Sequence, residues 1–118
     1  GGLAAAHAIN DGFAQEPQAH GMYHGEKVAF GVLTQLVLQK ADAQTLEEVL
    51  GFLARVELPM TLAQLGITEI REETLRKVAE AACVPTQSTK NLSPDITAED
   101  VYQALLEADG IGREYLAR

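Results

Sequence analysis

The spacing of apolar residues in the middle of the chain constrains its fold more than any other feature. Four apolar residues recur at the i, i+3, i+4 and i+7 positions of an α-helix: Leu46, Val49, Leu50 and Leu53. Glu47 and Glu48 fall on the water-facing side, so the pattern predicts an amphipathic helix over residues 43–56. No segment shows the period-two alternation that is typical of a half-buried strand. The fold class is therefore predicted to be all-α.

Other helices are predicted on each side of this one. They cover residues 2–10, a segment that begins at Glu26, residues 72–83 and residues 97–109, which residues 111–116 can extend. The segment from Glu26 is apolar over much of its surface and is expected in the core. Gly12 is expected to end the first helix as a left-handed cap, and Thr97 is expected to be an N-cap. We expect roughly five to seven helices in a bundle-like arrangement.

The remaining segments are predicted to be turns and loops. Residues 14–23 contain Pro17 and Gly21, and residues 84–94 are polar, so both are expected to be loops. Residues 61–66 are predicted to form one short helical turn that stops at Gly66.

Length and charge limit the class of protein. The chain has 118 residues, which suits one domain, and its 47% apolar content argues against disorder. The single domain is predicted to span residues 1–118. A formal net charge of −8 argues against nucleic acids and anionic membranes as partners. No apolar run approaches the roughly 20 residues of a membrane span. No signal peptide is expected either, because the start of the sequence has no basic region.

Cys83 is the single cysteine, which excludes an internal disulfide and a cysteine-based metal site. A reduced, cytoplasmic location fits this composition. Cys83 has no candidate basic partner other than Lys77 and Lys90, so its thiol is expected to be inert.

The three histidines all lie near the start of the sequence, at His7, His20 and His24. Neutral imidazole is a good ligand for Zn²⁺ and Fe²⁺, and clustering favours a metal site. His20 and His24 have the i, i+4 spacing, but the glycines at 21 and 25 disfavour helical geometry there. His7 and His24 can instead meet across two packed helices, with one further ligand outside this chain. Ordinary packed or exposed histidines remain the alternative.

Glu26 follows His24 closely and could orient a metal ligand through a hydrogen bond. An acidic residue in the first turn of a helix is explained equally well by the helix dipole.

Six motifs together resemble one family: "GGLAAAHAI", "YHGEKVAFG", "QLVL", "LPMTLAQLGI", "RKVAEAAC" and "VYQALLEADGIGREYL". With them the chain resembles the C-terminal part of the glycerol dehydrogenases, in the iron-containing, or group III, polyol and alcohol dehydrogenase family. The resemblance extends over nearly the whole chain. It implies the all-helical C-terminal domain of the dehydroquinate synthase-like fold, whose partner is an N-terminal, Rossmann-like, NAD-binding domain absent from this chain.

The resemblance also implies a metal site. In the family a divalent metal, zinc in glycerol dehydrogenases, lies between the two domains and is held by one Asp and two His. The two His correspond to His7 and His24, the Asp lies upstream of this chain, and His20 matches no ligand. Fe²⁺ or another divalent ion is the alternative to Zn²⁺. Relatives commonly read "AHAIHNGF" where this chain has Asn10-Asp11, so the loop expected there can differ.

The implied function is NAD-dependent oxidation of glycerol, or a related vicinal diol, to dihydroxyacetone by the full-length protein. The isolated chain is expected to be inactive, because it lacks the cofactor domain and one metal ligand. Phe13 and Phe30 are candidates for the apolar side of the substrate pocket, although core packing suits Phe30 better. The apolar surface that a missing domain would leave exposed predicts a homo-oligomer.

Two other hypotheses remain open. The chain could be a stand-alone helical interaction module of the same ancestry, without catalysis. It could also be a zinc protein that uses His7, His20 and His24. A helix predicted so close to Gly1 favours a truncated chain over the stand-alone module.

Overall fold

The computed structural model describes residues 4–13, 16–19, 24–83 and 95–118. Within them the chain forms five α-helices: α1 (Ala4–Phe13), α2 (His24–Leu38), α3 (Ala43–Arg55), α4 (Glu72–Ala82) and α5 (Ala98–Leu116). Two short 3-10 helices, η1 (Pro17–Ala19) and η2 (Ala63–Leu65), lie between them. The described residues contain no strand, so the all-α prediction is confirmed.

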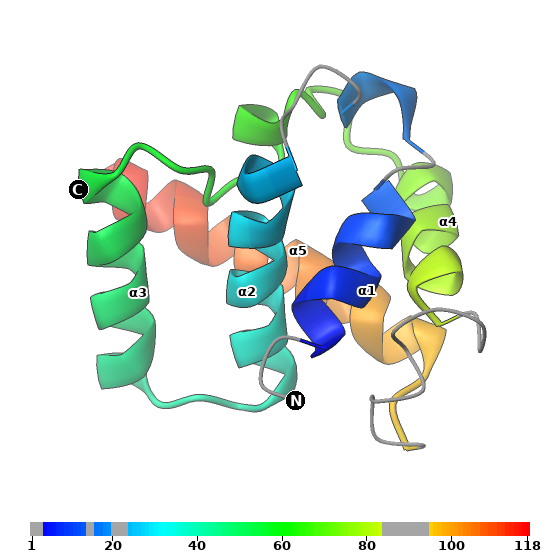
Figure 1. Cartoon of the computed structure of the whole chain (residues 1–118), viewed down its shortest axis with the longest axis horizontal. Coiled ribbons are helices and arrows are strands. Elements are labelled where there is room, and N and C mark those ends of the chain that lie inside the picture. Colours follow the sequence, from blue (N-terminus) through cyan, green and yellow to red (C-terminus); the bar gives the residue numbers. More distant parts are fainter. Residues whose placement is uncertain (1–3, 14–15, 20–23, 84–94) are drawn as a thin grey trace.

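The helices surround one core, with α1 placed between α2 and α4 (Figure 1). The long helix α5 runs behind and contacts both α2 and α4, while α3 lies on the far side of α2. Phe30, Leu33, Leu75 and Leu105 are fully buried where these helices meet. Burial of such side chains stabilises the fold by about 1.5–3 kcal/mol each.

The end of α1 differs from the sequence prediction. The helix runs through Asn10, Asp11 and Gly12 to Phe13, so Gly12 is not a left-handed cap. Gly12 is needed for a different reason: a Cβ there would lie 2.5 Å from the carbonyl oxygen of Val78 in α4. This close contact between helices was invisible to a prediction made from local signals.

The other boundaries follow the sequence closely. Thr97 caps α5 in a capping box, with its hydroxyl accepting from the Asp100 N–H at 3.1 Å. Helix α5 continues without a break to Leu116, and Gly66 ends η2 with φ 92°. Helix α2 begins at His24 instead of Glu26. Part of the region expected to be a loop forms η1.

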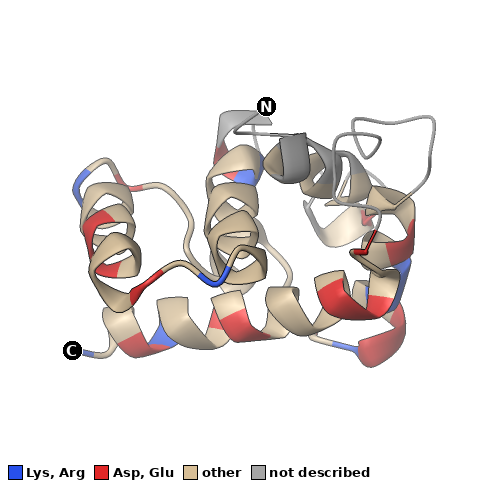
Figure 2. Cartoon of the chain, turned by 90° about the horizontal axis from the view of Figure 1, so that it is seen from below, with Lys and Arg blue, Asp and Glu red and all other residues tan. Residues whose placement is uncertain are grey.

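Acidic residues outnumber basic ones on the described helices, and they recur along α5 in Figure 2. Glu47 pairs with Arg118 and Glu72 with Arg76, and all four side chains remain well exposed. Glu47 lies on a solvated helix face, as predicted, and Glu72 does the same on α4. Such exposed pairs add little stability. No helix in the described part of the chain is long and apolar enough to cross a membrane.

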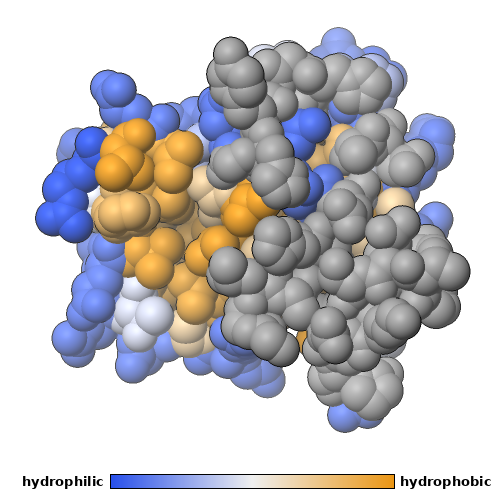
Figure 3. Space-filling view, in the orientation of Figure 1, coloured by the Kyte–Doolittle hydropathy of each residue, from blue (hydrophilic) through white to orange (hydrophobic). Residues whose placement is uncertain are grey.

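On the face shown in Figure 3, apolar side chains gather over α3. Four large apolar side chains are about half exposed, at 44–52% of their area: Phe52, Val56, Ile70 and Leu116.

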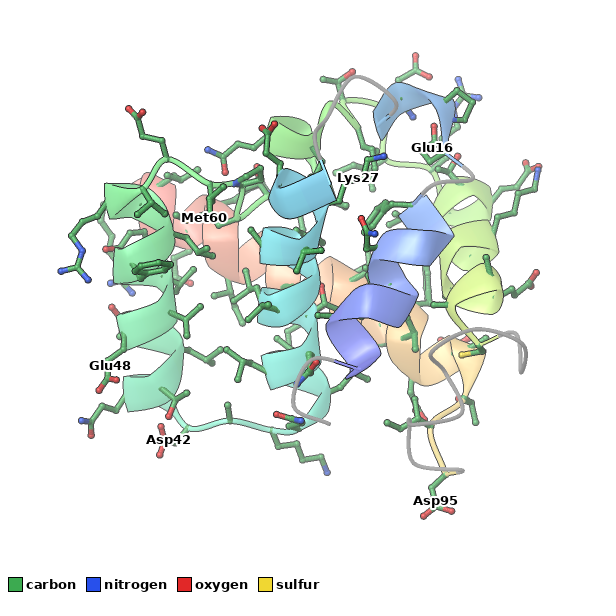
Figure 4. All side chains as sticks on the ribbon, viewed as in Figure 1. Glu16, Lys27, Asp42, Glu48, Met60 and Asp95 are labelled. Atoms are coloured by element: carbon green, nitrogen blue, oxygen red, sulfur yellow. The ribbon has the colours of Figure 1, made fainter. Side chains whose placement is uncertain are left out.

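The segment that follows α3 is held against α5. It includes Met60, which is labelled in Figure 4. The Asp109 side chain, 2% exposed, accepts a hydrogen bond from the Leu62 N–H at 2.8 Å. Its other oxygen accepts from Arg113 Nε at 2.9 Å. The Asp109 carboxylate is therefore the acceptor for the buried Leu62 N–H, which has no backbone acceptor in a helix or turn of the described chain.

Asp109→Ala is expected to lower the free energy of unfolding by about 2–3 kcal/mol, because the Leu62 N–H stays buried without its acceptor. Urea denaturation followed by circular dichroism measures this loss. Glu107→Ala, at an exposed position of the same helix, is the control and should change stability by less than about 0.5 kcal/mol. Equal effects of the two substitutions would contradict the assigned role of Asp109.

Candidate metal site

The structure places His7 near the start of α1 and His24 at the first residue of α2. Their backbones are described, whereas their side chains lie outside what the structure describes. His20 lies wholly outside the described residues, as do the loop predicted over 84–94 and parts of that predicted over 14–23. The two predicted ligands are thus carried by two helices that pack directly against each other.

The register between α1 and α2 is set near His7. The Ala6 N–H donates to Gln35 Oε1 at 3.0 Å, and a Cβ at Gly31 would lie 2.7 Å from the Ala6 carbonyl oxygen. The first turn of α1 therefore rests on the Gly31–Gln35 segment of α2.

Position 24 shares this face of α2. His24 precedes Gly31 by seven residues, which is about two helical turns or roughly 10 Å along the axis. Positions 24 and 31 consequently fall on one stripe of α2, the stripe that faces α1 at Gly31. This arrangement fits imidazole donors contributed by two facing helices, the geometry predicted for a site that requires a further ligand from elsewhere.

A second contact between the helices corrects one prediction. The rings of Phe13 and Phe30 meet edge to face, with centroids 6.0 Å apart and an interplanar angle of 71°. Both side chains have no exposed area, so the prediction that Phe13 lines a substrate pocket is wrong. Both rings are part of the hydrophobic core. Their edge-to-face contact adds to the stability gained from burial.

The residues around the two histidines also differ from expectation. Asn10 and Asp11, expected in a loop, lie within α1, and the Asn10 side chain is buried. Glu26 lies in the first turn of α2 and is half-buried. An acidic side chain in the first turn interacts favourably with the helix dipole, which is sufficient to explain Glu26. That Glu26 orients His24 stays a prediction.

Among the side chains that the structure describes, no group of three or more His, Cys, Asp or Glu lies together as a metal site would need. The side chains of His7, His20 and His24 lie outside the described part of the chain. What the structure describes is the packing of α1, which carries His7, against α2, which carries His24.

Cys83 caps the C-terminal end of α4 and is half-buried. Burial raises the pKa of its thiol, and the negative charge of Asp100 raises the pKa further. A raised pKa leaves less thiolate at neutral pH, so the structure supports the prediction of an inert thiol.

Alkylation of Cys83 by iodoacetamide at pH 7 is expected to be slower than that of an unstructured cysteine peptide. The rate should rise with pH beyond the range in which the peptide has reached its plateau, because the pKa is raised in the folded chain. Mass spectrometry of quenched samples measures both rates. A rate equal to that of the peptide across the pH range would contradict this account.

Gln35 is a buried residue whose contact with α1 was not predicted from the sequence. It is a polar residue, 7% exposed, on a helix that is otherwise apolar over much of its surface. Polar groups are seldom buried without a hydrogen-bond partner, so its presence on a core helix was the available signal.

Comparison with known proteins gives close relatives but no matching protein-family profile. Glycerol dehydrogenase of Pseudomonas putida is 48% identical over 116 residues, which cover 98% of this chain and 32% of that protein. Glycerol dehydrogenase of Escherichia coli O6:H1 is 50% identical over 116 residues, with the same two coverages. The chain therefore spans about a third of the length of the curated relatives it matches.

The fold agrees with these relatives. The crystal structure of a probable glycerol dehydrogenase from Sinorhizobium meliloti 1021 superposes with a TM-score of 0.88 at 40% identity, covering 93% of this chain and 31% of that one. Fold and sequence thus define an all-helical unit like the one found in these dehydrogenases. More particularly, the chain belongs to the glycerol dehydrogenase family.

Proposed function

We propose that the chain is the metal-binding helical part of an NAD-dependent, zinc-containing glycerol dehydrogenase, which oxidises glycerol to dihydroxyacetone. The observation that carries this proposal is identity of about one half to two glycerol dehydrogenases over 98% of the chain. The same alignments cover only 32% of those relatives. We therefore propose that the whole of residues 1–118 is one domain and that a further NAD-binding domain belongs to the active polypeptide.

In this proposal His7 and His24 each give one imidazole nitrogen to the metal. The third ligand, an Asp, comes from outside these residues. Bound zinc would supply Lewis acidity toward a substrate hydroxyl, and NAD would accept the hydride. The packing of α1 on α2 fixes the separation of the two histidine backbones. A metal held by only three protein ligands would keep a coordination position open for a vicinal diol. Fe²⁺ remains the alternative metal, since imidazole binds both ions.

The isolated chain of 118 residues is expected to be inactive, because it carries two of three proposed ligands and no NAD site. Reduction of NAD in the presence of glycerol and zinc is the test. It should occur with a polypeptide that joins this chain to the preceding portion of a relative, and not with the chain alone. Glycerol oxidation by the isolated chain would contradict the proposed division of the site.

We also propose that the isolated chain self-associates. The half-exposed Phe52 and Val56 of α3 form apolar surface that a second copy can cover. Light scattering should show a dimer or larger species, whereas a monomer at high concentration would contradict self-association. The stand-alone module is not favoured, because the relatives named above are enzymes by name. A cytoplasmic location is proposed on the basis of the single cysteine.

A further inference from the structure

We propose that Gln35 is a positioning residue: it holds the first turn of α1, and with it His7, in register against α2 and His24. This inference rests on the proposed function of His7 and His24 as metal ligands. Gln35 itself lies within α2 and contacts α1 through the backbone of Ala6.

Gln35 serves the Ala6 N–H in the way that a helix-capping side chain does. The first N–H groups of a helix have no acceptor within that helix, and a side chain just before the helix usually serves them. Here the Ala6 N–H donates to Gln35 Oε1 at 3.0 Å, across a separation of 29 residues in the chain. Ala6 is fully buried and Gln35 is 7% exposed. Water therefore cannot easily take the place of this acceptor.

The hydrogen bond restricts sliding of α1 along α2, which apolar packing alone permits. Gly31 allows α1 to approach α2 closely, because a Cβ there would lie 2.7 Å from the Ala6 carbonyl oxygen. Apolar contacts are non-directional and permit sliding, whereas a hydrogen bond weakens steeply as its geometry departs from the preferred distance and angle. Gly31 thus sets how near the helices lie, and Gln35 sets how far α1 is displaced along α2.

This register bears directly on the proposed metal site. His7 follows Ala6 in the chain, so a displacement of Ala6 moves the His7 backbone with it. His24, Gly31 and Gln35 lie along the same stripe of α2. Metal coordination tolerates ligand displacements of only about 0.2 Å, so loss of register weakens binding even when both histidines remain.

The experiment compares three variants of the full polypeptide that contains this chain. Gln35→Leu keeps the bulk of the side chain and removes the acceptor, while Gln35→Glu keeps an oxygen at the same reach. Thr34→Val is the matched control, because Thr34 is also buried in α2 but its hydroxyl bonds to the Phe30 carbonyl oxygen of the same helix, at 3.0 Å.

Two readouts are measured. Hydrogen exchange of the Ala6 amide, without metal, should become about tenfold faster in Gln35→Leu than in Thr34→Val. Titration with Co²⁺, followed by its visible absorption, should show an affinity about tenfold weaker in Gln35→Leu. Gln35→Glu should restore both readouts to near the parent values, a rescue that general destabilisation would not give.

The outcomes separate the two proposals. His7→Ala and His24→Ala are titrated with Co²⁺ in parallel. If these two variants bind Co²⁺ as the parent does, the proposed metal site is wrong and the inference falls with it. If they lose Co²⁺ while Gln35→Leu keeps the parent affinity or the parent exchange rate at Ala6, the metal site stands and the role of Gln35 is overturned.

Discussion

Replacing His7 or His24 by Ala in the full-length polypeptide should lower the rate of glycerol oxidation by about a thousandfold. A metal acting on a substrate oxygen contributes several kcal/mol to transition-state stabilisation, and each 1.36 kcal/mol corresponds to about a factor of ten in rate. Either substitution removes a proposed ligand from helices that pack together. Bound zinc, measured by atomic absorption after dialysis, should fall in parallel with the rate.

His20→Ala is the control for these substitutions, because His20 matches no ligand in the family pattern. It should retain its zinc and change the rate by less than about threefold, as expected for a residue that takes no part in the metal site. Loss of zinc in His20→Ala would favour the three-histidine site. Full zinc content in His7→Ala and His24→Ala would contradict the ligand assignment.

Gly112→Ala should destabilise the fold by about 3 kcal/mol. A Cβ at Gly112 would overlap the carbonyl oxygen of Met60 and lie 2.7 Å from its carbonyl carbon. Met60 belongs to the segment that Asp109 holds against α5, so the backbone there is already fixed by a hydrogen bond at Leu62. Thermal and urea denaturation of the variant measure the loss.

Gly110→Ala is the matched control for this prediction. Gly110 lies two positions earlier in α5, and a Cβ there would meet nothing within 4 Å. Alanine is a better helix former than glycine, so this variant should gain about 0.5–1 kcal/mol. A neutral or stabilising Gly112→Ala would show that the segment containing Met60 moves away freely, and would contradict the close packing described here.

The sequence predicted helices well wherever local signals agreed. Apolar periodicity located α3 and α4, and Thr97 marked the start of α5 through a capping box that uses Asp100. Gly66 ended η2 as expected, because its positive φ favours glycine. Such features depend on neighbours in the sequence, which a single chain reveals.

The failures share one physical cause, which is contact between residues far apart in the chain. Gly12 lies within α1, where it contacts Val78 in α4, and Phe13 is buried against Phe30 in α2. The acceptor for the Ala6 N–H comes from Gln35. None of these partners can be deduced from spacing. The histidines and the family motifs led to the proposed metal site, whereas the register between α1 and α2 could be found only from the structure.

Anomalous diffraction at the zinc absorption edge, from crystals of the full-length polypeptide grown with zinc, tests the central claim most directly. The account predicts one strong peak between α1 and α2, at about 2.0–2.1 Å from a ring nitrogen of both His7 and His24. A zinc peak that touches neither histidine, or only one of them together with His20, would contradict it.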